Sequence, residues 1–289
     1  MLRVYMNKMS LFTLCCLVLC IGCNTTEPTI EKELLPPSRA EIQIKYNQKE
    51  LYATIEKRED KNVDVFLLFH GTVQKDSNII EAANTTLNNF SNIIQRNNLF
   101  MISVAYPQEN LLFGDNIEYA EAALLWVKNN AEKELGITIN KIFLGGHSQG
   151  GYIVTRLNTM HKTDGVIANA PGPLNLVYRC SLEENGTIQP GAVCAKLRNL
   201  YGTTSQNPSA YFDRSLLNFT DGYLGDILFV QGLNDAPIQM YSWPTFKQEV
   251  QNCSDCKKVE ILEIPGGGHT SMFIDSLGIN AVKDFINKR

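Results

Sequence analysis

The sequence predicts an α/β fold, in which a mostly parallel central sheet is flanked by helices, with an antiparallel hairpin at its N-terminal end and a lid insertion. Three observations predict this fold. Two alternating apolar and polar segments open the folded part of the chain, apolar runs then alternate with helix-like periods, and one segment between two strands is far longer than the others. Alternation of strand and helix is typical of a parallel sheet with helices on both faces.

Composition limits the class of protein. The chain has 289 residues, of which 44% are hydrophobic and 19% are charged, and these values exclude a disordered, collagen-like or coiled-coil protein. The 26 Lys and Arg against 30 Asp and Glu give a net charge of −4, with no long run of either sign. We therefore expect one large globular domain and no nucleic-acid partner. The sequence carries no signal for an oligomeric state.

The N-terminal residues predict a targeting signal. The apolar run 11–23 is too short to span a bilayer and has the length of a signal-peptide core. It ends in Ile21-Gly22-Cys23, which resembles a bacterial lipobox, although Cys20 stands where leucine is usual. We expect residues 1–22 to be removed and Cys23 to carry a lipid anchor, in an exported lipoprotein of the bacterial cell envelope, at the periplasm or cell surface. An ordinary secretory signal peptide is the alternative.

The folded domain is expected at 41–289, after the lipidated cysteine and a polar, flexible tether at 23–40. Residues 41–46 and 51–55 alternate apolar and polar side chains on either side of Asn47. This pattern predicts an antiparallel hairpin with one exposed face.

Each later element is predicted by its own pattern. Residues 63–69 form a nearly continuous apolar run, as expected for a strand buried on both faces. Similar runs predict strands at 99–105, 141–144, 165–170, 226–230 and 258–264, and helical periodicity predicts helices at 79–94, 117–135, 150–160 and 271–287.

The segment 171–225 interrupts this alternation. It is much longer than the usual loop of 2 to 6 residues in an α/β unit, and it contains a possible helix near 192–200 and the tyrosines Tyr178, Tyr201 and Tyr211. Long insertions in compact domains are usually lids or binding elements, so we expect it to contact substrate. A surface excursion without a role in binding is the alternative.

A candidate nucleophile lies at the end of one predicted strand. Residues 141–152 read KIFLGGHSQGGY and place Gly146-His147-Ser148-Gln149-Gly150 between a strand and a helix. The pattern Gly-x-Ser-x-Gly is weak evidence alone. However, a sharp strand-to-helix turn needs glycine two residues before and two after the serine to avoid clashes, and it exposes the hydroxyl at a helix N-terminus. We therefore select Ser148 as the nucleophile.

A serine nucleophile needs a base, normally histidine. Of the four histidines, His147 lies on the turn itself, His161 follows a helix and resembles a surface residue, and His70 follows a buried strand upstream of the serine. The remaining one, His269, lies in a glycine-rich loop between the last predicted strand and the last predicted helix. Position and elimination both favour His269 as the base.

The best candidate for the acid that orients this histidine is Asp235, just past the carboxyl end of a predicted strand. Open α/β folds place their ligands at this edge of the sheet. The competing carboxylates Asp213, Asp221 and Asp255 lack that position. The alternative role for Asp235 is a turn or helix cap before Ala236-Pro237.

From about Glu41 onward this arrangement resembles the α/β-hydrolase superfamily. The order Ser148, Asp235, His269 matches the family order of nucleophile, acid and histidine. The His70-Gly71 pair matches the turn that supplies one oxyanion donor in the family, so the resemblance implies donors at the backbone N–H groups of Thr72 and Gln149. It implies a serine hydrolase that cleaves a small-molecule carboxylic ester and needs no cofactor.

The resemblance leaves two other functions open. A peptidase or amidase would use the same triad, and a noncatalytic envelope lipoprotein could keep the fold as a binding module. The GHSQGGY stretch is similar to the dienelactone-hydrolase-like, polyester-depolymerase-like and prolyl-oligopeptidase-like branches, and no segment decides among them.

Four cysteines follow the predicted signal, all in predicted loops outside the sheet. They allow three pairings in an oxidising compartment, and they stay free thiols if the host does not oxidise them. We choose the local pairing, Cys180 with Cys194 and Cys253 with Cys256. The CSDC segment could also be a redox or zinc motif, but no second pair and no histidine cluster completes a metal site, so we expect no metal.

Overall fold

The computed structural model describes residues 36–58 and 60–289. The predicted signal peptide, Cys23 and residues 24–35 of the predicted tether lie outside the described residues. The predicted end of the tether at residue 40 is wrong, because residues 38–40 already belong to the first strand, β1 (Ser38–Tyr46). Within the described ranges, no helix is both long enough and apolar enough to cross a membrane.

The described residues contain an eight-stranded sheet with the order β1-β2-β4-β3-β5-β6-β7-β8. The pairs β1/β2 and β2/β4 are antiparallel, and every other pair is parallel. The predicted fold class is therefore confirmed. The strands are β1 (Ser38–Tyr46), β2 (Lys49–Lys57), β3 (Asn62–Phe69), β4 (Leu99–Ala105), β5 (Thr138–His147), β6 (Gly165–Asn169), β7 (Ile227–Gly232) and β8 (Val259–Ile264).

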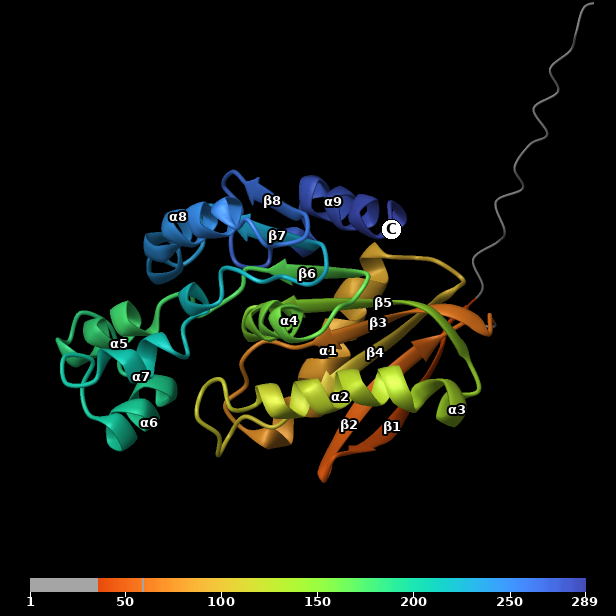
Figure 1. Cartoon of the computed structure of the whole chain (residues 1–289), viewed down its shortest axis with the longest axis horizontal. Coiled ribbons are helices and arrows are strands. Elements are labelled where there is room, and N and C mark those ends of the chain that lie inside the picture. Colours follow the sequence, from red (N-terminus) through yellow and green to blue (C-terminus); the bar gives the residue numbers. More distant parts are fainter. Residues whose placement is uncertain (1–35, 59) are drawn as a thin grey trace, which may run out of the picture. The chain divides into compact units, whose positions relative to one another are not determined.

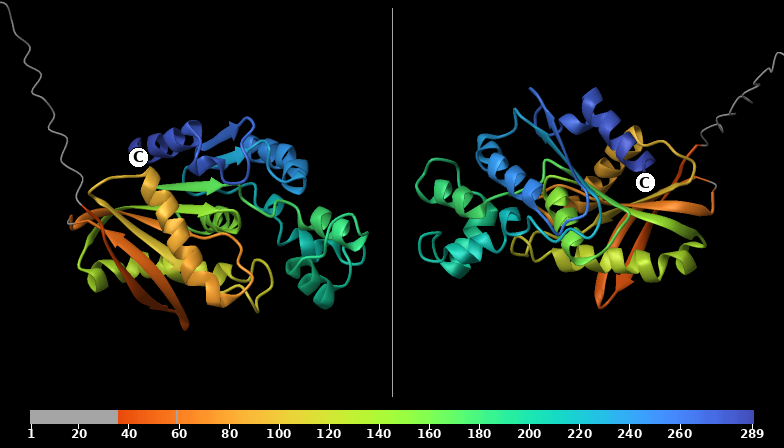
Figure 2. Two further views of the ribbon diagram at one scale, coloured as in Figure 1. Left: turned by 180° about the vertical axis from the view of Figure 1, so that it is seen from behind. Right: turned by 45° about the horizontal axis from the view of Figure 1, so that its top comes forward.

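Helices cover both faces of the sheet (Figures 1 and 2). One face packs against α1 (Ile79–Ile93) and α9 (Ser276–Asn287), and the other packs against α2 (Ile117–Asn129), α4 (Gln149–Met160) and α8 (Pro237–Asn252). Successive residues of a strand point to opposite faces. In β3, Phe66 therefore joins one hydrophobic cluster, and its neighbours Val65 and Leu67 join the other.

The predicted hairpin is confirmed and is longer than its apolar pattern. β1 and β2 pair from Ser38 with Lys57 to Tyr46 with Lys49. The turn between them consists of Asn47 and Gln48, whose φ angles are 45° and 64°. Positive φ at both central residues is the geometry of the tight turns that suit the twist of a hairpin.

Two predicted helices each divide into two shorter pieces. The helix expected at 117–135 ends at Asn129 and restarts as α3 (Ala131–Leu135), because Asn130 leaves helical geometry with φ −125°. The helix expected at 271–287 divides into η3 (Ser271–Phe273) and α9. The side chain of Asp275 caps α9 by accepting a hydrogen bond from the backbone of Leu277 at 2.8 Å.

Helix α8 was not predicted. Its sequence begins with Pro237 and contains Pro244, and its buried residues are few: Ser242, Trp243, Phe246 and Val250. Proline opens a helix well but interrupts its interior hydrogen bonds. The sequence therefore lacked a clear helical period here, and packing of the two large aromatic residues against the core holds the helix in place.

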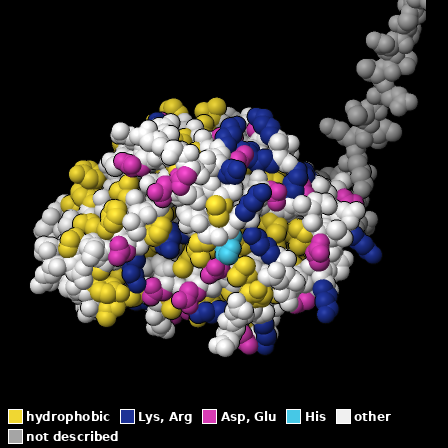
Figure 3. Space-filling view, viewed as in Figure 1, with side chains coloured by type: hydrophobic (Ala, Val, Ile, Leu, Met, Phe, Trp, Pro, Cys, Tyr) yellow, Lys and Arg dark blue, Asp and Glu magenta, His cyan; other side chains and the backbone are white. Residues whose placement is uncertain are grey.

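The long insertion between β6 and β7 folds into the helices α5 (Leu176–Glu184), α6 (Ala192–Tyr201) and α7 (Pro208–Phe212) and the short turn η2 (Leu216–Asn218). We call these helices the cap. Figures 1 and 2 show the cap helices gathered beyond the carboxyl ends of the parallel strands. Hydrophobic side chains are exposed at this end of the molecule (Figure 3), including Leu200 and Phe212.

Both expected disulfides are present, Cys180 to Cys194 and Cys253 to Cys256. The expectation that all four cysteines lie in loops is wrong for the first pair, because Cys180 belongs to α5 and Cys194 to α6. Both side chains are fully buried, so this disulfide joins two cap helices through their packed faces.

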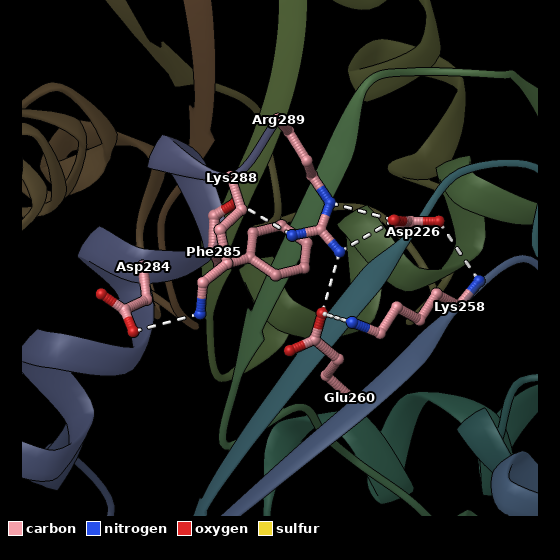
Figure 4. Close-up of polar contacts among 7 residues, drawn as sticks. All are labelled: Asp226, Lys258, Glu260, Asp284, Phe285, Lys288 and Arg289. Carbon is pink, nitrogen blue, oxygen red and sulfur yellow. Dashed lines mark hydrogen bonds and ion pairs between the residues drawn. The ribbon is translucent and has the colours of Figure 1, made fainter.

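Arg289 fixes the end of α9 to the sheet (Figure 4). Its guanidinium donates to Asp226 at 2.8 and 3.1 Å and to Glu260 at 2.9 Å, and it lies 3.6 Å from the centre of the Phe285 ring. Asp226 precedes β7 and Glu260 lies in β8, so one side chain joins the last helix to two adjacent strands.

Candidate active site

Ser148 occupies a sharp turn between β5 and α4. Its backbone has φ 56° and ψ −116°, an unusual conformation for a residue with a side chain. The turn is held from several sides: the Ser148 N–H donates to Asn169 at 2.9 Å, and its carbonyl accepts from Tyr152 and Gly172. This is the strained strand-to-helix geometry that the sequence predicted for a nucleophile.

The two glycines that flank this turn are required by close backbone contacts. A Cβ atom on Gly146 would lie 2.1 Å from the carbonyl oxygen of Gly150, and a Cβ atom on Gly150 would lie 1.9 Å from that of Phe69. No rotamer change relieves a clash with backbone atoms. The steric reason given for glycine at both positions therefore holds.

Asp235 and His269 form a direct pair. Nδ1 of His269 lies 2.8 Å from Oδ2 of Asp235, whose side chain is only 3% exposed. Oδ2 also accepts from Gln231 at 2.9 Å, and Oδ1 accepts from the backbone of Ala236 at 2.6 Å. Burial raises the pKa of Asp235, but these hydrogen bonds outweigh it, so the pKa lies below its usual range.

The loops that carry these two residues are packed backbone against backbone. A Cβ atom on Gly232, at the end of β7, would lie 2.3 Å from the carbonyl oxygen of Gly268. The N–H of Asn234 donates to the Gly267 carbonyl at 2.7 Å. The spacing between Asp235 and His269 is therefore set by main-chain contacts as well as by their own hydrogen bond.

Ser148, Asp235 and His269 line one pocket of about 430 Å³. The three candidate residues, far apart in the sequence, thus meet at the carboxyl edge of the sheet. Within the part of the chain that the structure describes, no hydrogen bond joins the Ser148 hydroxyl to His269. Because Nδ1 of His269 faces Asp235, its Nε2 is the nitrogen left for a second partner.

Thr72 and Gln149 approach each other at the same edge. The Thr72 hydroxyl donates to Oε1 of Gln149 at 2.9 Å, and Thr72 lines the pocket beside Ser148. Gln149 is the first residue of α4, where the N–H group has no partner inside the helix. Among the described residues, neither backbone N–H donates a hydrogen bond, so both are available to an oxygen in the pocket.

His147, next to the candidate nucleophile, is held neutral. Burial and the neighbouring His269 lower the pKa of His147 to about 3. Its Nδ1 lies 2.9 Å from Nδ2 of Asn169, and its ring packs against His269 and Phe273. These contacts give His147 a packing role in the turn that carries Ser148.

The other two histidines do not line the pocket that holds Ser148, Asp235 and His269. Burial lowers the pKa of His70 to about 4, and its ring stacks on Tyr106 at 4.2 Å between ring centres. Nδ1 of His70 lies 2.7 Å from the Gly71 carbonyl. His161 pairs with Glu121 at 2.7 Å and does not line the pocket.

The rejected acids also lie elsewhere. None of Asp213, Asp221 and Asp255 lines the pocket. Asp255 instead accepts a hydrogen bond from the backbone N–H of Gly222. Cys253, Asp255 and Cys256 are close enough to suggest a metal site among the described residues. The two sulfurs are joined in a disulfide, however, and a disulfide offers no thiolate ligand.

The sequence did not indicate two amide side chains near the acid, Gln231 and Gln239. Gln231 is fully buried and donates to Asp235, and its Oε1 accepts from Gln239 at 3.2 Å. Gln239 in turn donates to the Pro171 carbonyl at 2.8 Å. The available signal was a glutamine at the end of an otherwise apolar strand. These amides link the acid to Pro171, in the loop that leads from β6 into the cap.

Comparison with known proteins defines the class. The family described as alpha/beta hydrolase fold matches residues 66–221, more than half of the chain. The chain therefore belongs to this family and is a hydrolase. No curated protein matches it.

Solved structures share the fold. An esterase of Pyrobaculum calidifontis superposes with a TM-score of 0.63 at 16% identity, covering 87% of this chain and 84% of that one. Est1E from Butyrivibrio proteoclasticus gives 0.59 at 17%, covering 86% and 98%. An acylaminoacyl peptidase of Pyrococcus horikoshii gives 0.63 at 12%, covering 87% of this chain but only 41% of the peptidase. At these identities the likeness shows the fold alone.

Proposed function

We propose that this protein is a serine hydrolase that cleaves carboxylic esters through an acyl-enzyme on Ser148. The observation that carries the proposal is the convergence of the Asp235–His269 pair and a positive-φ serine in one pocket. The family match supports hydrolysis, and esterases among the structural neighbours support ester chemistry.

Acylation would begin at the Ser148 hydroxyl. Nε2 of His269 takes the hydroxyl proton while Oγ bonds to the ester carbonyl carbon. The carbonyl oxygen becomes an oxyanion, which accepts hydrogen bonds from the N–H groups of Thr72 and Gln149. Asp235, which is already ionised and bonded to Nδ1, stabilises the imidazolium. His269 then gives the proton to the departing alkoxide, and the alcohol leaves.

Deacylation would repeat these steps with water. His269 takes a proton from water as its oxygen bonds to the acyl carbon, and the second oxyanion uses the same two donors. Collapse breaks the bond to Oγ, and the proton on His269 returns to Ser148. The acid product leaves and the free enzyme is restored.

A matched ester and amide test this proposal against the peptidase alternative. We expect a para-nitrophenyl acyl ester to be hydrolysed far faster than the para-nitroanilide of the same acid, with no turnover of the ester by Ser148→Ala. Faster cleavage of the anilide would favour a peptidase or amidase. Ester turnover that survives in folded Ser148→Ala would reject Ser148 as the nucleophile.

We also propose export and lipid attachment at Cys23, with the cap helices acting as a lid over the pocket. Two disulfides suit an oxidising compartment, and cap residues line the pocket next to Ser148. Metabolic labelling with an alkyne fatty acid in a bacterial host is expected to label the full chain and to fail in Cys23→Ser. Equal labelling of both would contradict lipidation at this cysteine.

A further inference from the structure

The cap places one arginine in the wall of the proposed active site. Arg179 of α5 lines the pocket that holds Ser148 and His269. It also lines an adjacent pocket of about 510 Å³ between the cap and the loops that follow β3 and β4. Thr72, Phe113 and Val193 line both pockets as well, so Arg179 lies where the two adjoin.

A buried carboxylate forms a long ion pair with one side of this arginine. Nε of Arg179 lies 3.5 Å from Oε1 of Glu183, whose side chain is 1% exposed. Oε2 of Glu183 is occupied by the N–H of Gly191 at 2.8 Å. Within the described ranges, the two terminal amino groups of Arg179 have no hydrogen-bond acceptor. A guanidinium with free terminal donors presents the fork that matches a carboxylate.

The residues around Arg179 favour a ligand that is largely apolar and carries one negative charge. Asp235 is the other permanent charge in the pocket wall, and it is already bonded to His269 and Gln231. The remaining wall is largely apolar: Phe113, Pro173, Leu174, Val193 and Ile238. Because a single arginine faces this space, a carboxylate fits better than a doubly charged phosphate monoester.

The adjacent pocket adds positive charge. Lys75, Lys196 and one carboxylate, Glu109, lie in its wall together with Arg179, and Nζ of Lys196 donates to the backbone carbonyls of Glu109 and Leu111. The Glu109 carboxylate accepts from the backbone of Asp76 at 3.1 Å. Positive side chains thus outnumber negative ones around the adjacent pocket, which favours an anion beside Arg179.

The first disulfide fixes the position of this arginine. Cys180 follows Arg179 directly in α5, and Cys194 follows Val193 in α6. The disulfide therefore holds together the two cap helices whose residues line both pockets. A side chain held in place before binding loses less entropy when it meets its ligand.

We propose that Arg179 is a specificity-determining residue that binds a carboxylate on the substrate, so that the preferred substrates are esters carrying a second, free carboxylate apart from the scissile carbonyl. The proposal rests on the ester hydrolysis proposed above. It narrows the substrate class to acidic esters, such as half-esters of dicarboxylic acids or esters of hydroxyaryl carboxylic acids.

Two pairs of probes place the charge on either side of the ester bond. The acyl-side pair is the mono-para-nitrophenyl ester of adipic acid and the same ester with a primary amide at the far end. The alcohol-side pair is para-acetoxyphenylacetate and its primary amide. Since each amide matches its acid in shape, the ratio of kcat/KM within a pair measures the contribution of the charge.

In the wild-type protein we expect the acid of at least one pair to have a kcat/KM about ten-fold or more above that of its amide. Arg179→Gln should bring that ratio close to one by raising KM for the acid while leaving the amide unchanged. Arg179→Lys should retain part of the preference. Arg198→Gln, on the next cap helix and outside both pockets, should retain all of it.

A second variant distinguishes the loss of carboxylate binding from a folding defect. Arg179→Gln leaves Glu183 buried without its partner, whereas Arg179→Gln with Glu183→Gln removes both charges. Loss of the preference in the folded double variant supports the proposal. Ratios near one for both pairs in the wild-type protein, or a ratio unchanged in the folded double variant, would overturn it.

The two proposals fail in different ways. Ser148-dependent hydrolysis of the neutral amide probes without any preference for the acids rejects the role of Arg179 and keeps the ester hydrolase. No Ser148-dependent hydrolysis of any probe rejects both.

Discussion

At the scale of single residues, the proposed chemistry depends on three side chains with different roles, those of Ser148, Asp235 and His269. Asp235 is buried and accepts three hydrogen bonds, so it is suited to hold one tautomer of His269. Ser148 owes its position to a backbone conformation that only tightly packed neighbours sustain. Neither role would be visible from the residue type alone.

Because the three residues act as a unit, their losses should not add. We expect Ser148→Ala and His269→Ala each to lower kcat by about a thousand-fold or more, and the double variant to be little worse than either. Steady-state kinetics on a para-nitrophenyl ester measure all three. Losses that multiply would show that the two residues act independently.

His147 gives the protein an acid-sensitive stability term. Burial and the neighbouring His269 lower its pKa from 6.5 to about 3. Below pH 6.5, His147 of the unfolded chain binds a proton, whereas in the folded protein it stays neutral until the pH approaches 3. The contribution of His147 to the unfolding free energy is therefore fully present above pH 6.5 and is lost as the pH falls toward 3.

Urea unfolding between pH 7 and pH 4 measures this effect. The unfolding free energy of the wild-type protein should fall with pH, and folded His147→Gln should fall less steeply, by about one proton in the slope. Equal slopes would mean that His147 titrates normally in the fold.

At the scale of elements, the strands were predictable, whereas of the cap only the insertion itself and the helix near 192–200, which is α6, were predictable. Continuous apolar runs such as 63–69 and 99–105 became β3 and β4 with nearly the same bounds, because burial on both faces leaves little choice of residue. Helix α5 buries only Leu176, Cys180 and Glu183, so its sequence shows no strong apolar period. Its position comes from tertiary contacts and a disulfide.

The same contrast holds for the site. Ser148, Asp235 and His269 could be predicted because each lies in a segment that directly follows a predicted buried strand. Their order in the chain and the flanking glycines are further signals in the sequence itself. The signal for Gln231 was weak, since it was only a polar residue at the end of an apolar strand, and Gln239 had none, since glutamine is common in helices. Arg179 belongs to the cap, and its place in the pocket depends on the packing of α5 against α6.

The two disulfides should differ in their effect on stability. Replacing Cys180 and Cys194, which are 14 residues apart, with alanine should lower the unfolding free energy by about 3 kcal/mol, because the closed loop is the longer one. Replacing Cys253 and Cys256, 3 residues apart, should cost about 2 kcal/mol.

Denaturant unfolding of both alanine pairs tests this order. The first pair should also lower activity, since it joins helices that line the pocket, and the second should not. A larger loss of stability in the second pair would show that loop length does not govern their contributions.

At the scale of the whole molecule, the chain order of the strands creates the site. Strand β4 follows β3 in the chain and lies on one side of it, whereas β6 follows β5 and lies on the opposite side. The strands β3 and β5 are therefore neighbours at the point where the strand order reverses. Their following loops carry Thr72 and Ser148, and open α/β sheets bind ligands at this place. The later strands bring Asp235 and His269 to the same edge.

Arg289 joins the end of α9 to β7 and β8 at the amino ends of these strands, opposite the candidate site. Arg289→Ala removes a guanidinium shared by Asp226 and Glu260, and we expect a loss of about 1 to 2 kcal/mol of unfolding free energy. Lys288→Ala is the matched control. Its ion pair with Asp284 is highly exposed, so its removal should change stability by less than about 0.5 kcal/mol. Equal effects in thermal or urea unfolding would contradict this assignment.

The most direct test of the central claim is mass spectrometry after reaction with a fluorophosphonate, which modifies an activated serine. We expect one adduct per chain, located by peptide mapping to Ser148, and greatly reduced labelling in folded His269→Ala. An unlabelled, folded wild-type protein would favour a noncatalytic binding role, and an adduct on any other serine would contradict the proposed triad.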